Sequence, residues 1–309
     1  MPPVTRVSLL DALPRRLVAS GPMQVSNPPR VGFIGAGRLG GSLAAALAKA
    51  GYQVTAIASR DTRAAAALAA DIGGNATVAP SAAGVVAMAD LVFLTVPDDA
   101  VAQLAAMLSW TPRHRAVHCS GALGLDVLQP VTAAGGAAGC IHPVQSFPER
   151  VPDPTRFEGI FCGVEGAEPL GGLLERMASE IGARTVRLEG VDRALYHAAA
   201  VFASNDAVAL LSAACRTWAL AGLSPDLARP ALVPLARSVI ANLAGLELDA
   251  ALTGPIARGD VGTVRRHLDA LAIEPALHDL YRVLGRELLP LASCGPEERA
   301  ALARLLDDQ

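Results

Sequence analysis

A glycine-rich turn between a short apolar run and an alanine-rich segment constrains this chain more than any other feature. Residues 31–34 are an apolar run typical of a strand covered on both faces, and Gly35, Gly37 and Gly40 follow it. In such a turn the first glycine makes the tight turn, the second lets backbone N–H groups approach a diphosphate, and the third lets a helix pack closely on the strand. The pattern therefore predicts that a dinucleotide binds at the start of the helix, where unpaired N–H groups favour negative charge.

The flanking segments agree with that prediction. A helix is expected over about residues 40–50, ending at Gly51, and a second strand over residues 53–59, within the length of one βαβ unit. Arg38 and Leu39, which lead from the glycines into the helix, are expected among the cofactor-binding residues. A purely structural turn is the alternative, because glycine-rich turns occur in many proteins.

Composition excludes several other classes of protein. With 309 residues, 52% of them hydrophobic and 18% charged, the chain can form two domains with large cores. A net charge of −3 and 4% aromatic residues offer little to a nucleic acid, which is not expected as a partner. Five scattered cysteines indicate reduced thiols in a cytoplasm rather than a disulfide framework. No metal-ligand cluster or nucleophile elbow is evident in the sequence.

The first 29 residues differ from the motif that follows. They lack the apolar centre of a signal peptide, so residues 1–29 are interpreted as a loosely attached N-terminal extension. Met23 lies just ahead of the first strand, which leaves Met1 and Met23 open as the start.

No segment is expected to span a membrane. Residues 194–215 come closest, but His197, Asn205 and Asp206 interrupt the apolar run. The interruption favours a helix that is buried in a protein core.

Strand and helix signals alternate as far as about residue 190 and then become helical only. We therefore expect an α/β protein with a dinucleotide-binding domain over residues 30–189, built on a doubly wound sheet, and an all-α domain over residues 190–309. Beyond the first two strands, strands are expected over residues 76–79 (at an edge), 91–96, 116–119, 138–141, 160–164 and 184–188, and helices over residues 64–70 and 169–181, with Ser81 as a helix cap. In the helical part, Pro225, Pro230, Pro234, Pro275, Pro290 and Pro296 are expected to separate helices.

The end of the second strand indicates which dinucleotide binds. NAD sites usually place a carboxylate there for the ribose 2′-hydroxyl, whereas this sequence has Ser59, Arg60 and Arg63. Serine can donate to a 2′-phosphate and arginine can pair with it through two N–H groups, which favours NADP(H) over NAD(H). Asp61 could still serve as the NAD-type acid if the register slips by two residues, and a solvated charge cluster is a further alternative.

Further candidates lie where the later strands end, because ligands gather at the carboxyl ends of parallel strands. Val96 and Pro97 end one strand and lead into the next helix, Ser120 and Gly121 follow another, and His142 precedes Pro143 at the end of a third. Ser120 and Gly121 could bond the nicotinamide amide or a substrate oxygen. His118 lies inside a predicted strand and is expected to be a core residue.

A set of short segments distributed from residue 31 to residue 260 completes the pattern. They are Val31-Gly-Phe-Ile-Gly-Ala-Gly-Arg-Leu-Gly, Val96-Pro97-Asp98, His118-Cys-Ser-Gly-Ala122, His142-Pro-Val-Gln-Ser-Phe147, Tyr196-His-Ala-Ala-Ala, Asn205 and Thr253-Gly-Pro-Ile-Ala-Arg-Gly-Asp260. Over about residues 30–290 the chain resembles a Rossmann-like family of NADP oxidoreductases whose C-terminal part is a domain of unknown function. Pyrroline-5-carboxylate reductase, ketopantoate reductase and prephenate dehydrogenase are more distant relatives.

The resemblance implies a helical C-terminal domain like that of 6-phosphogluconate dehydrogenase and a homodimer formed largely through it. Prephenate dehydrogenases have a similar His-Pro step, whose histidine binds the oxygen that loses its proton as hydride leaves. His142 is therefore the first catalytic candidate, and a pKa near neutrality would suit it to that task. A histidine bonded only to a neighbouring carbonyl is the alternative.

The second domain adds three candidates. Related dehydrogenases have a lysine one turn before an asparagine, but the residue one turn before Asn205 is Val201, so lysine chemistry is in doubt. One further turn back lies His197, either a catalytic group or a buried structural histidine. Arg258 could bind a substrate carboxylate, or it could pair with Asp260 to shape its loop.

These inferences lead to one expected function and two alternatives. We expect an NADP-dependent oxidoreductase that transfers hydride to or from a small carbonyl, imine or hydroxy acid in a cleft between two domains. A ketopantoate-type reductase is the alternative among enzymes. A protein that binds NADPH without turnover, as a sensor or scaffold, is the alternative of another class.

Overall fold

The computed structural model describes residues 28–307, and the chain divides after His197 into two compact units. The proposed extension, apart from residues 28 and 29, and the choice between Met1 and Met23 lie outside the described residues. The division falls close to the boundary expected near residue 190, inside a long helix. Each unit is described by itself below.

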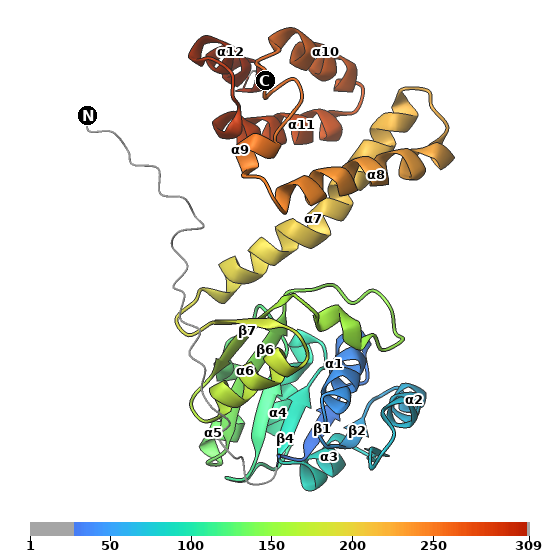
Figure 1. Cartoon of the computed structure of the whole chain (residues 1–309), viewed down its shortest axis with the longest axis vertical. Helices are drawn as coiled ribbons and strands as arrows, with labels where there is room; N and C mark the ends of the chain where they lie inside the picture. Colours follow the sequence, from blue (N-terminus) through green and yellow to red (C-terminus); the bar gives the residue numbers. More distant parts are fainter. Residues whose placement is uncertain (1–27, 308–309) are drawn as a thin grey trace, which may run out of the picture. The chain divides into compact units, whose positions relative to one another are not determined.

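The first unit is built on one mixed sheet of 8 strands in the order β3-β2-β1-β4-β5-β6-β7-β8 (Figure 1). Six strands run parallel, and β7 pairs antiparallel with β6 before β8 adds parallel to β7. The order of the first six strands is that of a dinucleotide-binding doubly wound sheet, which confirms the predicted fold class. The strands are β1 (Val31–Ile34), β2 (Val54–Ala58), β3 (Thr77–Val78), β4 (Leu91–Leu94), β5 (Arg115–His118), β6 (Ala137–Pro143), β7 (Phe161–Gly166) and β8 (Arg184–Arg187).

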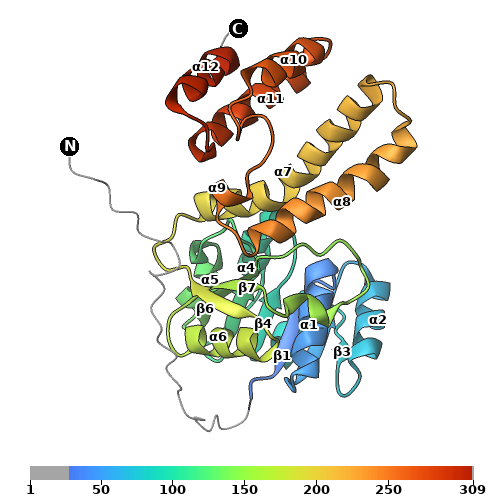
Figure 2. The same ribbon diagram turned by 45° about the horizontal axis from the view of Figure 1, so that its top comes forward.

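Helices cover both faces of this sheet, as Figures 1 and 2 show. On one face α1 (Arg38–Lys49), α2 (Thr62–Ile72) and α6 (Leu170–Glu180) pack on an apolar core. On the other, α3 (Ala82–Met88), α4 (Asp98–Met107) and α5 (Gln129–Ala133) pack on a second core. Short 3₁₀ turns, η1 (Leu125–Leu128) and η2 (Pro154–Phe157), complete the unit. The central strands β1 and β4 are buried throughout, as their continuous apolar runs predict.

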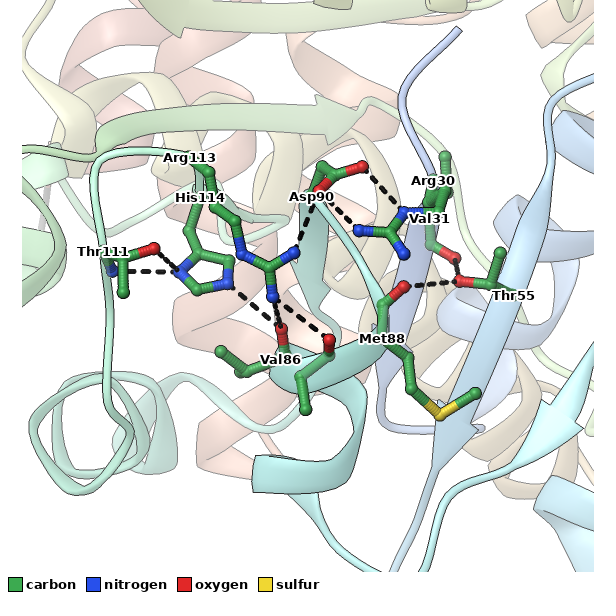
Figure 3. A network of polar contacts seen from close by, with 10 residues as sticks. Arg30, Val31, Thr55, Val86, Met88, Asp90, Thr111, Arg113 and His114 are labelled. Carbon is green, nitrogen blue, oxygen red and sulfur yellow. Dashed lines mark hydrogen bonds and ion pairs between the residues drawn. The ribbon is translucent and has the colours of Figure 1, made fainter.

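The amino-terminal edge of the sheet is held by a polar network that contains no candidate site residue (Figure 3). Arg30, just before β1, bonds Asp90, just before β4, through two N–H groups at 3.0 and 2.9 Å. Arg113, just before β5, approaches the same carboxylate at 3.4 Å. The Nε2 of His114 lies 3.1 Å from the carbonyl of Val86 in α3. These contacts join the starts of neighbouring strands and leave the carboxyl-terminal edge for ligands.

The second unit is helical, as predicted. Its core lies between α10, α11 and α12, where Val264, Leu268, Leu302 and Leu306 are buried. Figure 2 shows α8 folding back from the turn at the end of α7. The helices are α7 (Arg193–Leu220), which begins in the first unit, α8 (Pro225–Leu243), α9 (Leu248–Ala251), α10 (Val261–Leu271), α11 (Pro275–Leu288) with the 3₁₀ turn η3 (Leu289–Leu291), and α12 (Pro296–Asp307).

The predicted role of two prolines was wrong. Pro225, Pro275 and Pro296 begin helices as expected, but Pro230 and Pro234 lie inside α8, which continues through both. A proline removes the bond to the carbonyl four residues earlier and tends to kink or break a helix. In α8 most residues are exposed, so water can bond the released carbonyls.

The burial expected for residues 194–215 is also absent within the single chain. α7 is long and apolar enough to cross a membrane by length and composition alone, a test that core helices of soluble proteins also pass, yet only 6% of its apolar window is buried. Among its described residues only Ala213 is buried. Its apolar side chains are distributed around the helix, and Phe202 and Val208 are 73% and 71% exposed.

Candidate functional site

Four loops meet at the carboxyl-terminal edge of the sheet. Because β1, β4, β5 and β6 are parallel neighbours in register, the residues that follow them lie along one edge. The glycine turn follows β1, Pro97 follows β4, Gly121 follows β5, and His142 lies near the end of β6. The structure thus brings together candidates that are more than 100 residues apart in the sequence.

The three glycines differ in what surrounds them. Gly35 has a φ of +116°, and a Cβ there would lie 2.3 Å from the carbonyl oxygen of Thr95, so both conformation and space require glycine. A Cβ on Gly40 would lie 2.4 Å from the carbonyl oxygen of Gly35 and from Oγ1 of Thr95. At Gly37 the described residues place no atom within 4 Å. The tight turn and the close helix packing predicted for Gly35 and Gly40 are therefore confirmed, while the approach of a diphosphate at Gly37 stays a prediction.

The start of α1 is open to an anion. Its N-cap is Gly37, which has no side chain to bond the first N–H groups, and no acidic residue lies in the first turn. The helix begins at Arg38, two residues earlier than expected, and both Gly37 and Arg38 are exposed while Leu39 packs against the core. An uncapped helix N-terminus with a basic residue beside it has the right chemistry for a diphosphate.

The observed end of β2 shows which residues follow the strand, and therefore whether Asp61 could serve as the NAD-type acid. β2 ends at Ala58, so Ser59 and Arg60 follow it directly and Asp61 is the N-cap of α2. The Asp61 carboxylate accepts the N–H of Ala64 at 3.2 Å, and its own N–H donates to Ser59 Oγ at 3.2 Å. Asp61 is thus engaged in capping, and the exposed side chains of Arg60 and Arg63 lie beside it in sequence. This arrangement fits a 2′-phosphate better than a 2′-hydroxyl.

The loops after β4 and β5 are joined by one short contact. Pro97 is the N-cap of α4, Val96 lies half-buried before it, and Asp98 opens the helix. The hydroxyl of Ser120 donates to the Asp98 carboxylate at 2.5 Å and accepts the N–H groups of Ala122 and Leu123 at 3.1 Å. A hydroxyl has one proton and two lone pairs, so that of Ser120 is fully used in holding these two loops. Bonding to a nicotinamide or substrate would require one of these contacts to break.

His142 lies against the first turn of α7. Its Nδ1 is 2.8 Å from the hydroxyl of Tyr196, and its ring lies edge-on to that of His197 with centroids 6.1 Å apart. A Cβ added to Gly121 would fall within 2.8 Å of both His142 Nε2 and His197 Nδ1. The two candidate histidines and the glycine after β5 therefore meet at one point, and no side chain other than hydrogen fits on Gly121.

A buried ion pair lies in the same first turn of α7. Arg193 is 10% exposed in its side chain and pairs with Glu165 of β7 at 2.7 Å. His118, fully buried at the end of β5, accepts the N–H of Ser120 on Nδ1 at 3.2 Å, which confirms it as a core residue. The Cys140 thiol, also buried, donates to the Ser120 carbonyl at 3.5 Å.

Several buried nitrogens of this cluster have no hydrogen-bond partner among residues 28–307. They are Nε2 of His118, Nε and Nη1 of Arg193, and Nδ1 of His197. Buried polar groups are normally satisfied, so unsatisfied ones mark a place where water or a ligand belongs. The concentration of these nitrogens beside His142 identifies the cluster as the candidate site.

The electrostatics of His142 differ from the sequence prediction. Burial lowers the pKa of His142 to about 4, with smaller contributions from His197 and Arg193, so the expected pKa near neutrality was wrong. Burial also raises the pKa of Tyr196 to about 12. At neutral pH both groups are uncharged, and His142 is a neutral imidazole rather than an imidazolium.

Asn205 lies in the second unit, on the exposed surface of α7. Its Oδ1 accepts the hydroxyl of Ser204 at 3.0 Å, and that hydroxyl also lies 2.7 Å from the carbonyl of Ala200. Both contacts are local to the helix. The catalytic role of Asn205 therefore stays a prediction.

Arg258 also lies in the second unit and is exposed. Asp260, its proposed alternative partner, caps α10 by accepting the N–H and the hydroxyl of Thr263 at 2.9 and 2.7 Å. The described residues contain no ion pair between Arg258 and Asp260, although the charge of Arg258 contributes to lowering the pKa of Asp260 after the Thr263 bonds. Arg258 is left available for an anionic ligand, as the first of the two alternatives proposes.

Sequence reasoning did not identify Arg193, Tyr196 or Asp98 as members of the site. Arg193, Tyr196 and His197 are spaced i, i+3 and i+4, which places them on one face of a helix. This polar face at the start of an otherwise apolar helix could have identified Arg193 and Tyr196 as members of the site. Tyr196 and Asp98 also lie in two of the short segments that carry the family resemblance, although neither was given a role in the site.

Comparison with known families divides the chain in the same way. The family described as a Rossmann-like domain matches residues 20–143, and the domain of unknown function DUF2520 matches residues 160–288. No curated protein sequence matches the chain.

Solved structures give the same picture. A candidate NADP oxidoreductase from Bacteroides fragilis is 26% identical, covers 84% of this chain and 98% of its own, and superimposes with a TM-score of 0.68. A protein from Thermotoga maritima is 28% identical over 85% of this chain and 98% of its own, with a TM-score of 0.66. A reductive aminase from Aspergillus terreus, solved with NADPH and ethyl levulinate, is 14% identical over 90% of this chain and 99% of its own, with a TM-score of 0.64, and shows the shared fold. Two family models thus match successive parts of the chain, that of a Rossmann-like domain over residues 20–143 and that of DUF2520 over residues 160–288.

Proposed function

We propose that this protein is an NADP(H)-dependent oxidoreductase acting on a small carbonyl, imine or hydroxy acid. The observation that carries the proposal is the meeting of His142, Tyr196 and His197 with Gly121 on the sheet edge that also bears the open glycine turn. The similarity to a candidate NADP oxidoreductase supports the same cofactor. A cleft between the two units as the place of reaction stays a prediction.

The residues fit the proposed cofactor in two places. The uncapped start of α1 at Gly37 and Arg38 would hold the diphosphate, and Ser59, Arg60 and Arg63 would hold the 2′-phosphate. When bound, NADP(H) supplies or accepts the hydride.

His142 would handle the proton. The Tyr196 hydroxyl can donate to Nδ1 or accept from it, so the neutral ring can present Nε2 either as an N–H or as a lone pair. With the N–H outward, His142 would give its Nε2 proton to the oxygen or nitrogen of a substrate that is being reduced, while Nδ1 takes up the proton of the Tyr196 hydroxyl. With the lone pair outward, it accepts the proton of a hydroxyl group that is being oxidised. The unpaired nitrogens of Arg193 and His197 beside it would help to orient the substrate.

The function is tested in two steps. Fluorescence titration measures whether NADPH and NADH bind, and NADPH consumption is then followed against 2-oxo acids, including ketopantoate, and cyclic imines. Turnover of ketopantoate alone would identify the ketopantoate-type alternative. Tight NADPH binding without turnover would favour the alternative of a sensor or scaffold. That alternative is also favoured by Val201, which stands where related dehydrogenases have a lysine. Failure of both nucleotides to bind would overturn the proposal.

We further propose a cytoplasmic homodimer. The apolar side chains of Phe202 on α7, Ile240 on α8 and Ile273 just after α10 are 73%, 66% and 74% exposed in the single chain, and we refer to them together as the apolar surface of the helical unit. Monomers rarely expose so much apolar surface, and a second copy offers the same surface in return. The reduced state of the five free cysteines agrees with a cytoplasm.

A further inference from the structure

The loop that follows β6 returns to the start of α1. The backbone N–H of Asp153 donates to Ser42 Oγ at 3.0 Å, and a Cβ on Gly41 would lie 3.4 Å from Pro152. Both Gly41 and Ser42 belong to the part of α1 that follows the glycine turn. The loop is therefore held against the helix that we assign to the diphosphate.

This loop carries a positive charge to the end of β2. Arg150 Nη1 lies 3.4 Å from Oδ2 of Asp61, although the two residues are 89 positions apart. The other Asp61 oxygen is engaged by the N–H of Ala64, which it caps. Arg150 thus occupies the one carboxylate oxygen that capping leaves free.

The contact changes the charge balance at the proposed 2′-phosphate site. Asp61 would repel a phosphate, but Arg150 offsets its charge, and Arg60 and Arg63 remain as cations beside it. The side chain of Arg150 is 80% exposed, so its pairing with Asp61 contributes little to stability. The same exposure leaves most of its N–H groups available to a ligand.

We propose that Arg150 is a further anchor for the 2′-phosphate of NADP(H), reaching it from the loop after β6. The inference rests on the proposed cofactor and adds a specificity residue from outside the βαβ unit. Guanidinium and phosphate pair through two parallel N–H···O bonds, and a dianion beside Asp61 is a stronger partner for Arg150 than Asp61 alone.

The first test uses nucleotides without a nicotinamide. Calorimetry measures the binding of 2′,5′-ADP, which carries the 2′-phosphate, and of 5′-ADP, which lacks it, to the wild type and to Arg150→Gln. We expect the substitution to weaken 2′,5′-ADP about ten- to thirtyfold, the lower part of the range for a charge-assisted bond, and 5′-ADP less than about twofold. Arg176→Gln, on the exposed side of α6, removes the same charge from the same unit and should leave both affinities unchanged.

A second variant separates the phosphate from Asp61. Asn caps helices about as well as Asp, so Asp61→Asn keeps the start of α2 and removes the partner of Arg150. In that background Arg150→Gln should still weaken 2′,5′-ADP, because the lost contact is with the ligand. If the loss disappears there, Arg150 acts only by neutralising Asp61 and the proposal is overturned.

The wild-type chain offers an independent test. Trypsin cleaves after arginine, and Val151, which follows Arg150, is 72% exposed. Saturating 2′,5′-ADP should slow cleavage after Arg150 at least about threefold, and 5′-ADP should not, since only the former engages the guanidinium. Unchanged cleavage would count against the anchor. Absence of any 2′,5′-ADP binding to the wild type would overturn the cofactor proposal as well, whereas normal binding by Arg150→Gln would overturn this inference alone.

Discussion

The hydroxyl of Tyr196 lies 2.8 Å from Nδ1 of His142, which ties the first turn of α7 to the carboxyl end of β6. The contact holds the His142 ring and leaves its Nε2 as the only nitrogen that can face a ligand. Removing the hydroxyl should therefore disturb the chemistry without disturbing the nucleotide site.

Tyr196→Phe should lower turnover about tenfold, the value of one hydrogen bond of roughly 1.4 kcal/mol, and leave the NADPH dissociation constant unchanged. His142→Asn and His197→Ala should lower kcat further, by about 10²–10⁴, again with normal NADPH binding. Steady-state rates with a substrate found by the panel, together with fluorescence titration, provide the measurement. Normal turnover in all three variants would remove this cluster from the mechanism.

Stability should depend on pH because of the buried histidines. The pKa values of His118 and His142 are about 4 in the folded chain and about 6.5 when unfolded, so between these values the unfolded chain binds more protons. The contribution of these two histidines to the free energy of unfolding is therefore fully present above about pH 6.5 and is lost as the pH falls toward 4. Each histidine contributes a slope of up to about 1.4 kcal/mol per pH unit. Urea unfolding at pH 4.5 to 7.5 should show a shallower slope for His142→Asn, and an unchanged slope would contradict the burial argument.

Two glycines of the turn should respond oppositely to alanine. Gly40→Ala places a Cβ against backbone at 2.4 Å and should cost about 1–3 kcal/mol of unfolding free energy. Gly37→Ala places it in open space and should leave stability nearly unchanged while weakening NADPH at least about tenfold, because the diphosphate would occupy that space. Urea unfolding and NADPH titration of both variants check the contrast. Normal NADPH affinity of Gly37→Ala would argue for a purely structural turn.

Arg60→Ala should discriminate between the two nicotinamide cofactors. Loss of a charge-assisted contact to the 2′-phosphate should cost NADPH about 1.5–3 kcal/mol of binding free energy and leave NADH almost unaffected. Competitive titration against wild type gives both values, and Lys49→Ala, at the far end of α1, controls for net charge. Equal losses for both cofactors would place Arg60 outside the phosphate site.

The apolar surface of the helical unit should hold two copies together. Light scattering at micromolar concentration should give twice the chain mass of 31.6 kDa. Ile240→Asp, at a side chain 66% exposed on α8, should shift the mass toward the monomer because a charge at an apolar interface is costly. Met107→Asp, at 69% exposure on α4, is the matched control and should remain dimeric. A monomeric wild type would exclude the homodimer.

The fold could be predicted from the sequence where local rules decide it. The apolar run and Gly35 specify a strand and a turn without help from distant residues, and β1 has the predicted limits. Ser81 caps α3 as expected, accepting the N–H of Gly84 at 3.2 Å. Local rules failed at Pro234, where a helix continues through a residue that usually ends one.

The candidate site was only partly predictable, because its contacts join elements far apart in the chain. His142 was proposed from its strand and its proline, but the lowering of its pKa depends on its burial and, to a smaller extent, on His197 and Arg193, which no local pattern records. Arg193 meets Glu165 only once α7 lies beside β7. The sequence indicates no partner for the Ser120 hydroxyl, whereas in the structure all its hydrogen bonds are made. Its acceptor Asp98 follows β4 and Ser120 follows β5, so the contact forms only when the two strands pair.

Arg193, Tyr196 and His197 lie in the first turn of α7, a single helix of 28 residues. At about 1.5 Å per residue such a helix is roughly 40 Å long. The same helix carries Phe202, which belongs to the apolar surface that we assign to a second copy, as well as Tyr196, the partner of His142. In the proposed homodimer, pairing of the chains and the chemistry at His142 would therefore share one structural element.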